Sequence, residues 1–346
     1  MRLIGFGDRK CAAPCSDSRG QPVGFAAPTT VELMSENLNQ GRTAASGERM
    51  VPHRAGRLRI GIISAGRVGA ALGSGLRAAG HTITGPYASS EASRDRLETM
   101  LPGIPAMPVQ QIIENSDLVL IAIPDDEIAG LADGAAKLGL WRPGQLVIHV
   151  AGSRGTSILA PAAKSGALTL AIHPAMTFTG TSLDVARLVG CPFAVTGPAM
   201  LLPIGQALVT ELGGHPVVVG EEDRGLYHAA LSHGANHLVT LVAEAMRMLE
   251  AVGIEDSGAY LAPLLEASLD GALRSGEALL TGPVVRGDVG TVAEHAAAID
   301  ALAATGEYGD VPPVYRALAT ATAQRAQERR LLRPEQAEAI LAVLKQ

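Results

Sequence analysis

Polar side chains recur at four-residue intervals along one apolar segment, at His228, Ser232 and Asn236. If that segment is a helix, residues four apart lie on one face. A solvent-facing stripe normally carries Lys, Glu or Arg, whereas this one is neutral, which is typical of a small-molecule pocket. A hydrated helix face is the alternative. These three residues are the catalytic candidates, because an imidazole can give a proton to a carbonyl oxygen as hydride arrives, and Asn236 can hold that oxygen.

Three further residues are candidates for binding a substrate. Ser153 and His173 each follow a predicted buried strand, and ligands of parallel sheets bind beyond the carboxyl ends of the strands. Arg286 lies in a loop punctuated by glycine and proline, and its guanidinium group matches a carboxylate through two hydrogen bonds. The competing interpretations are a helix cap for Ser153, a structural role for His173, and an ion pair between Arg286 and Asp288. No metal site is predicted.

The stretch 59–80 predicts the element around which the chain is organised. A short apolar strand is followed by a turn of small residues and then by apolar residues at helical spacing, up to a glycine suited to a C-cap. Such a turn lets the backbone approach a pyrophosphate, and the helix N-terminus offers free N–H groups. The pattern departs from G-x-G-x-x-G only at its first glycine. The expected cofactor-binding turn is Ser64, Ala65, Gly66, Arg67, Val68 and Gly69.

The second predicted strand, 81–87, indicates which nicotinamide nucleotide binds. A cofactor with a free 2′-hydroxyl is held by an acidic residue at the tip of this strand, and none is present. Hydroxyl and guanidinium groups follow instead and suit a 2′-phosphate, so the sequence predicts NADP(H). The alternative is that the arginines here, Arg94 and Arg96, are ordinary solvated residues of a helix. The contributing residues are expected to be Ser89, Ser90 and Arg94 after this strand, together with Ile123 and Pro124 at the end of the strand at 118–123.

Strands and helices alternate up to about residue 220, and only helices follow. The alternation predicts an α/β Rossmann fold, with a doubly wound and mostly parallel sheet at 57–220, followed by an all-α domain at 221–346. Residues 1–56 have no hydrophobic period and are expected to form a disordered tail, with a later start codon as an alternative. Further strands are expected at 146–150, 168–172 and 193–196, and helices at 91–101, 224–252, 263–280, 314–329 and 335–344, with one more beginning near Thr291 in a capping box with Glu294.

The composition excludes several classes of protein. The chain of 346 residues has 28 Lys and Arg against 34 Asp and Glu, a formal net charge of −6 without a basic block, which argues against a nucleic-acid partner. No apolar run reaches the roughly 18 residues of a membrane span. Cys11, Cys15 and Cys191 form no disulfide framework and suit a reducing cytoplasm. Apolar faces and small residues in the helical half predict a homodimer.

With both halves considered, the chain resembles a bacterial Rossmann-like family with a C-terminal domain of unknown function, numbered 2520. The resemblance covers about Arg59 to Gln346 and rests, in order, on IGIISAGRVG, LIAIPDDEI, HVAGSRG, AIHPAMTF, YHAALSHGANHLV and LTGPVVRGD. The fold of that family is similar to those of pyrroline-5-carboxylate reductases, 6-phosphogluconate-type β-hydroxyacid dehydrogenases and ketopantoate reductases. In those relatives the Rossmann domain binds NADP(H), and a helical domain closes the site and forms a dimer.

The resemblance implies an NADPH-dependent reductase of a small 2-keto acid, since some proteins similar to this family reduce 2-dehydropantoate (ketopantoate). β-Hydroxyacid dehydrogenases and conventional ketopantoate reductases carry a catalytic lysine on the first long helix after the sheet, and here that helix has no lysine. Two alternatives therefore stay open. One is an imine reductase of the pyrroline-5-carboxylate type, and the other is a non-catalytic nucleotide-binding or scaffold protein with a degenerate Rossmann site.

Overall fold

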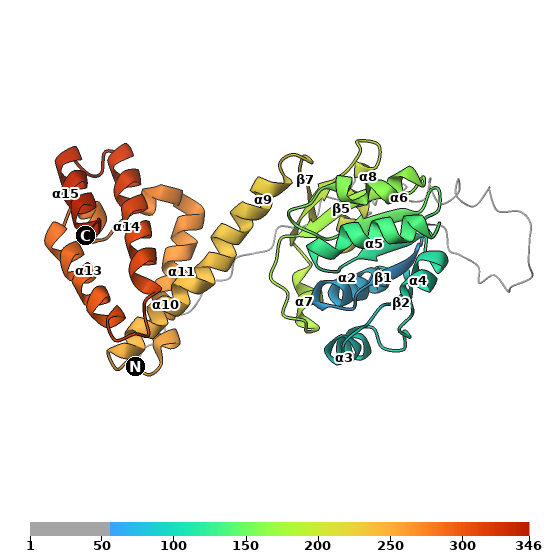
Figure 1. Cartoon of the computed structure of the whole chain (residues 1–346), viewed down its shortest axis with the longest axis horizontal. Coiled ribbons are helices and arrows are strands. Elements are labelled where there is room, and N and C mark those ends of the chain that lie inside the picture. Colours follow the sequence, from blue (N-terminus) through green and yellow to red (C-terminus); the bar gives the residue numbers. More distant parts are fainter. Residues whose placement is uncertain (1–55, 346) are drawn as a thin grey trace, which may run out of the picture. The chain divides into compact units, whose positions relative to one another are not determined.

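The computed structural model describes residues 56–345, which belong to two compact units. The first unit ends at Ser232 and the second begins at His233. All the strands lie in the first unit, and the described part of the second is helical (Figure 1). The predicted fold class, a Rossmann-type sheet followed by an all-helical region, is confirmed. The predicted tail at 1–56, with Cys11 and Cys15, lies outside the described residues except for Gly56.

A seven-stranded sheet forms the centre of the first unit. Its strands are β1 Arg59–Ile63, β2 Thr82–Pro86, β3 Leu118–Ile121, β4 Leu146–His149, β5 Leu168–Pro174, β6 Pro192–Thr196 and β7 His215–Val218. The order is β2-β1-β3-β4-β5-β6-β7, parallel from β2 to β5, with β6 antiparallel to β5 and β7 parallel to β6. The direction of strand addition reverses between β1 and β3, and ligands of such sheets bind at this switch point.

Helices cover both faces of this sheet (Figure 1). They are α2 Arg67–Ala78, α3 Glu91–Met100, α4 Val109–Asn115, α5 Asp125–Lys137, α6 Ala160–Lys164, α7 Leu183–Arg187 and α8 Leu202–Glu211. Successive residues of a strand face opposite layers. In β3, Leu118 and Leu120 pack with α2, α3 and α8, whereas Val119 and Ile121 pack with α4, α5 and α6. The strand is apolar throughout because helices bury both of its faces.

Three elements of the first unit lack a clear signal in the sequence. The strand β7 has a proline at its second position and is exposed along most of its length, so no apolar alternation marks it. The helix α4 has only seven residues. The helix α8 contains a proline and a glycine, which usually indicate turns.

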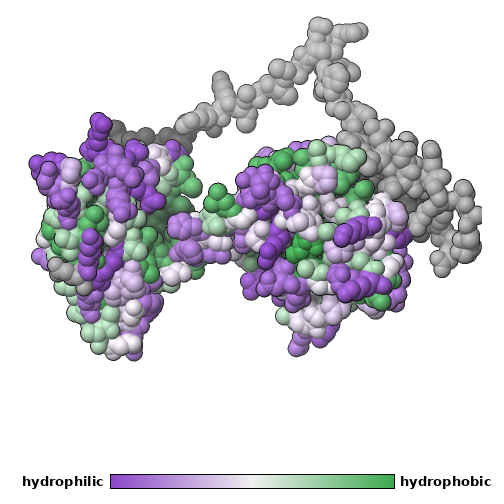
Figure 2. Space-filling view, turned by 45° about the horizontal axis from the view of Figure 1, so that its top comes forward, coloured by the Kyte–Doolittle hydropathy of each residue, from purple (hydrophilic) through white to green (hydrophobic). Residues whose placement is uncertain are grey.

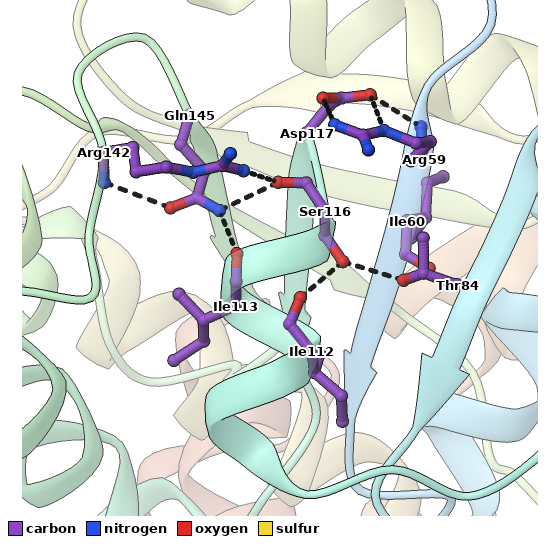
Figure 3. A network of polar contacts seen from close by, with 9 residues as sticks. All are labelled: Arg59, Ile60, Thr84, Ile112, Ile113, Ser116, Asp117, Arg142 and Gln145. Carbon is purple, nitrogen blue, oxygen red and sulfur yellow. Dashed lines mark hydrogen bonds and ion pairs between the residues drawn. The ribbon is translucent and has the colours of Figure 1, made fainter. Parts of the chain in front are cut away.

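A polar network joins the amino ends of the central strands (Figure 3). Ser116 Oγ donates to the Ile112 carbonyl at 2.6 Å and lies 2.8 Å from Thr84 Oγ1. Gln145 Nε2 donates to the carbonyl oxygens of Ile113 and Ser116, at 2.7 and 2.9 Å. These bonds tie the end of α4 to the start of β4. Beside them, Arg59 and Asp117 form an ion pair at 2.8 Å.

The second unit contains α10 His237–Ala251, α11 Ser257–Ser275, α12 Pro283–Arg286, α13 Val289–Ala303, α14 Val311–Glu328 and α15 Pro334–Leu344. Its core lies among α12 to α15. Two predicted helix starts are wrong. The helix α11 begins at Ser257 and not at Pro263, because Asp256 caps it by accepting a hydrogen bond from the Ala259 N–H at 3.1 Å. The helix α13 begins at Val289, two residues before the predicted capping box.

The helix predicted at 224–252 is interrupted. The helix α9 spans Arg224–Leu231, a π-helical turn spans Ser232–Asn236, and α10 follows. The boundary between the two units falls within this turn. A π-helical turn holds more residues than an α-helical one, and such turns are frequent at functional sites. The predicted polar stripe therefore crosses an irregular segment and not a regular helix.

Candidate functional site

The turn between β1 and α2 has the backbone course that a dinucleotide requires. Ser64 has a φ of 87°, in the left-handed region that favours glycine, so it replaces the first glycine of the pattern while keeping its conformation. A Cβ on Gly69 would lie 2.1 Å from the Ser64 carbonyl oxygen, whereas one on Gly66 would meet only Ser64 Oγ, at 3.3 Å. The N-terminus of α2 has no side-chain cap and no acidic residue in its first turn. The turn therefore fits a pyrophosphate.

Arginine side chains surround this turn without carboxylate partners. Among residues 56–345, no ion pair includes Arg67, Arg94 or Arg96. Arg96 Nη1 donates to the Ala65 carbonyl at 3.2 Å. A Cβ on Gly180 would lie 3.0 Å from Arg67 Cγ and 3.3 Å from Arg96 Nε, so the same loop packs against both arginines. The contact of Arg96 with the turn could not be inferred from the sequence, because it depends on how α3 folds back.

Ser89, Ser90 and Arg94 lie directly after β2, and all three are exposed. Arg94 Nη1 donates to the Ser89 carbonyl at 3.5 Å. Ser90 Oγ caps α3 by accepting a hydrogen bond from the Ser93 N–H at 3.2 Å, which leaves its own hydrogen for a further acceptor. A role for these groups at a 2′-phosphate stays a prediction.

Ile123 and Pro124 follow β3, so they lie at the switch point between β1 and β3. Asp125 begins α5, where an acidic residue complements the helix dipole. Its carboxylate accepts a hydrogen bond from Ser153 Oγ at 3.1 Å. The alternative role of Ser153 as a helix cap is wrong, since the 3₁₀ turn Thr156–Leu159 follows Gly155 and has no side-chain cap.

His173, Tyr227 and His228 meet at the carboxyl end of β5. His173 Nδ1 lies 2.9 Å from Tyr227 Oη, and the His173 and His228 rings meet edge to face with centroids 5.8 Å apart. Gly152, on the loop after β4, lies against both imidazoles. A Cβ there would lie 2.9 Å from His228 Nε2 and 3.0 Å from His173 Nε2. Two predicted site residues, far apart in the sequence, are thus neighbours.

Arg224, which the sequence argument did not single out, is buried at the first position of α9 with 1% exposure. Its Nη2 donates to the Ala151 carbonyl at 2.7 Å, and its Nε donates to the Arg154 carbonyl at 2.9 Å. These bonds fix the loop that carries Gly152 to the helix that carries His228. Its Nη1 is buried without a hydrogen-bond partner. A buried donor left unused is costly in a purely structural role.

Burial makes the imidazoles near Arg224 weak bases. Desolvation and, to a smaller extent, the positive charge of Arg224 together lower the pKa of His173 to about 4. Desolvation also lowers the pKa of His149 to about 4. His149 Nδ1 accepts a hydrogen bond from the Ala151 N–H, so its Nε2 donates to the Gly155 carbonyl, 2.9 Å away. Both imidazoles are neutral at pH 7.

Among the described residues, no side-chain contact joins the other predicted residues, Ser232, Asn236 and Arg286, to His173, Tyr227 and His228. Ser232 and Asn236 lie in the π-helical turn, where Ser232 is half-buried and Asn236 is exposed. Arg286 belongs to the second unit, where its Nε forms an ion pair with Asp288 at 2.9 Å. The alternative that the sequence left open for Arg286 is therefore the observed one, and a substrate role stays a prediction. Among residues 56–345, no group of three acidic, His or Cys side chains could hold a metal ion.

Two family models match the chain. A Rossmann-like domain matches residues 44–174, and the domain of unknown function DUF2520 matches residues 191–322. The chain combines a Rossmann-like domain with a DUF2520 domain. The resemblance drawn from the sequence motifs is thus confirmed. The DUF2520 match begins within the sheet and includes β6, α8 and β7. The predicted domain boundary after residue 220 stays a prediction.

Solved structures share the fold of this chain. A Bacteroides fragilis protein, provisionally described as an NADP oxidoreductase, is 18% identical with a TM-score of 0.64, over 77% of this chain and 98% of that one. Protein TM1727 from Thermotoga maritima is 20% identical with a TM-score of 0.54, over 78% and 99%. An imine reductase from Myxococcus stipitatus in complex with NADP+ is 20% identical with a TM-score of 0.50, over 83% and 93%.

No curated protein matches the sequence. Within residues 56–345, no helix combines the length and the apolarity needed to cross a bilayer.

Proposed function

We propose that this protein is an NADPH-dependent reductase of a small carboxylate that carries a carbonyl or imine group. The observation that carries the proposal is the glycine-type conformation of Ser64, because it keeps the dinucleotide turn intact despite the missing glycine. Arg67, Arg94 and Arg96, which lack carboxylate partners among the described residues, would hold the 2′-phosphate. The fold shared with the NADP+-bound imine reductase also supports it. When bound, NADPH would supply the hydride.

The chemistry would take place at the carboxyl end of β5. His228 is the proposed proton donor to the substrate, and His173, whose ring contacts that of His228, would hold the same reacting group. Arg224 keeps the loop at Gly152 in place beneath both imidazoles. Ser232 and Asn236 remain candidates for orienting the substrate. The cytoplasm is the proposed compartment, because the sequence has few cysteines and the described one, Cys191, is a free thiol.

The leading substrate candidate is 2-dehydropantoate, by the family resemblance. An imine reductase of the pyrroline-5-carboxylate type is the alternative within the same class. A non-catalytic nucleotide-binding protein is the alternative from another class, and the absent lysine motivates it.

An NADPH oxidation assay with a panel of 2-keto acids and cyclic imines tests the proposal. Turnover of at least one class, with NADPH preferred over NADH, is the expected result. Absence of turnover together with nucleotide binding would favour the non-catalytic alternative. Absence of NADPH binding would contradict the proposal as a whole.

The second unit has an apolar surface that we propose to be a homodimer interface. In α10 and α11 only Glu244 and Ser257 are buried, and many large apolar side chains are exposed (Figure 2). They include Val239, Tyr260, Leu264, Leu269 and Leu273, each at least 50% exposed. Surfaces of this kind usually mark an interface. Light scattering at micromolar concentration, on protein lacking the residues before Met50, should give the dimer mass, and a monomer mass would contradict the proposal.

A further inference from the structure

Two imidazole nitrogens, His173 Nε2 and His228 Nε2, lie close to the backbone of Gly152. A Cβ on Gly152 would lie 2.3 Å from His228 Cδ2, 2.9 Å from His228 Nε2 and 3.0 Å from His173 Nε2, so any side chain at 152 would displace both rings. The glycine therefore lets both rings pack against the backbone, with their two Nε2 atoms near one point. Which substrate atom these nitrogens can bind depends on whether each Nε2 donates or accepts a hydrogen bond.

For His173, the contact with Tyr227 determines whether Nε2 donates or accepts a hydrogen bond. The 2.9 Å separation of Tyr227 Oη and His173 Nδ1 is a hydrogen bond, and its direction follows from the chemistry of the two groups. A phenol is a stronger acid than a neutral imidazole N–H, and an imidazole nitrogen is a stronger base than a phenol oxygen. The phenol therefore donates to Nδ1. Since the hydrogen bond at one ring nitrogen sets the state of the other, Nε2 of the neutral imidazole carries the hydrogen.

We propose that Tyr227 is a positioning residue that holds His173 as a hydrogen-bond donor on Nε2, so that the site receives a carbonyl oxygen and discriminates against an iminium N–H. This inference rests on the proposed reductase function and narrows its substrate class. An iminium nitrogen has a hydrogen to donate and would oppose the His173 N–H. A carbonyl oxygen accepts from His173 and is left with a second lone pair for His228.

The charges around His173 favour the same class. Arg224, His149 and His228 are the titratable groups that act on it, and all three lower its pKa. The two carboxylates that act on Arg224 are already engaged, Asp125 by Ser153 Oγ and Glu221 by the Thr156 and Ser157 N–H groups. An iminium group would thus add a positive charge near the buried Arg224 charge without an unengaged carboxylate to offset it, whereas a keto group adds no charge.

When bound, NADPH would supply a hydride to the carbonyl carbon, and His228 would give a proton to the oxygen, so that an alcohol and NADP+ form. The proton that His228 gives up would be replaced from solvent, so the overall reaction consumes one proton. His173 keeps its own hydrogen throughout, because its low basicity prevents it from carrying a second proton at neutral pH.

Nitrogen-15 NMR of the histidine side chains tests the tautomer directly, without any substrate. In the wild-type protein at pH 7.5 His173 should show hydrogen on Nε2 and an unprotonated Nδ1. Hydrogen on Nδ1, or on both nitrogens, would overturn the inference. Comparison with Tyr227→Phe should show a loss of this preference and assigns the effect to the phenol.

Kinetics test the consequence for the substrate, with 2-dehydropantoate and 1-pyrroline-5-carboxylate as the two probes. Tyr227→Phe should lower kcat for the keto acid about tenfold, leave KM for NADPH unchanged, and not lower kcat for the imine. His173→Gln, which keeps a donor near the Nε2 position, should retain more keto-acid turnover than His173→Leu. Equal losses on both probes, or faster imine than keto-acid turnover in the wild type, would overturn the inference.

The second unit offers a matched control. Tyr315 Oη lies 3.2 Å from His295 Nδ1, the same type of contact as that between Tyr227 and His173. Tyr315→Phe should leave the ratio of keto-acid to imine turnover unchanged, and a shift as large as that of Tyr227→Phe would overturn the assignment. If neither probe oxidises NADPH, the proposed function fails, while the NMR result still decides the tautomer.

Discussion

The amino edge and the carboxyl edge of the sheet differ in how their polar groups are arranged. At the amino edge, Gln145 Nε2 is saturated by two carbonyl oxygens, Ser116 donates within α4, and Arg59 pairs with Asp117 (Figure 3). Protein groups complete these interactions, so they stabilise the fold and offer a ligand little.

At the carboxyl edge several features are unusual for a purely structural region. Arg224 is buried with an unused Nη1, Ser64 has a left-handed backbone, and the imidazoles of His173 and His228 pack against the backbone of Gly152. Each of these features costs stability. Features that cost stability are expected where a sequence is selected for function. The contrast therefore favours the carboxyl edge as the functional one.

The largest expected effect on turnover is that of replacing His228, at the carboxyl edge. His228→Asn is expected to lower turnover by roughly 10²–10⁴-fold, as for a lost general acid, because His173 is too weak a base to replace it. NADPH affinity should stay unchanged. Steady-state kinetics with a nucleotide titration measure both. Wild-type turnover in the variant would remove His228 from the mechanism and leave His173 or His233 to be tested.

The pH dependence of stability should reveal the buried imidazoles of the carboxyl edge. His149 and His173 have folded pKa values of about 4, below the value of about 6.5 in an unfolded chain. The unfolded state therefore binds more protons between these values, and stability is lost as pH falls from about 6.5 to 4, by roughly 3 kcal/mol per imidazole at most.

Urea unfolding at pH 7 and pH 4.5 measures this loss. His173→Gln removes one of the two groups, so its loss should be smaller than that of the wild type by roughly 1–2 kcal/mol. Carboxylates titrate in both proteins and cancel in the comparison. An equal loss in both would show that His173 is not a buried neutral imidazole.

Substitutions of the two glycines in the turn should affect different properties, stability in one case and NADPH affinity in the other. Gly69→Ala puts a Cβ 2.1 Å from the Ser64 carbonyl, so it should destabilise the protein by roughly 1–3 kcal/mol. Gly66→Ala meets only Ser64 Oγ, so stability should be nearly retained while NADPH affinity falls about tenfold through the lost approach of the pyrophosphate. Thermal melts and nucleotide titration distinguish them. Unchanged affinity in Gly66→Ala would place the nucleotide elsewhere.

A substitution at the amino edge should have the smallest effect on turnover. It should lower the stability of the protein instead. Gln145→Leu removes three hydrogen bonds from a residue with 4% exposure and should cost roughly 1–3 kcal/mol in the free energy of unfolding. Because no ligand is expected at this edge, kcat for the preferred substrate should remain at the wild-type value. A drop in turnover without a drop in stability would contradict the division between the edges.

The fold was more predictable than the site. The parallel strands are apolar on both faces, and the turn at Gly66 and Gly69 is a local pattern, so both can be inferred from short stretches. The weakly patterned β7, the start of α11 and the π-helical turn depend on tertiary packing or on caps that propensity does not reveal.

At the site, residue types were predictable and pairings were not. His173 and His228 stood out as polar residues at favourable positions. Tyr227 meets His173 across 54 residues, and Arg224 reaches Ala151 across 73. Such contacts exist only once the sheet and α9 are assembled. A buried arginine also gives no signal in a sequence, because arginine is usually exposed.

Hydrogen exchange of the amides, with and without NADPH, tests the central claim most directly, since both edges are observed in one experiment. NADPH should slow exchange in the turn from Ser64 to Ala70, while exchange at 112–117 and 142–146 stays unchanged. Protection confined to the amino edge, or no protection at the turn at saturating NADPH, would contradict the account.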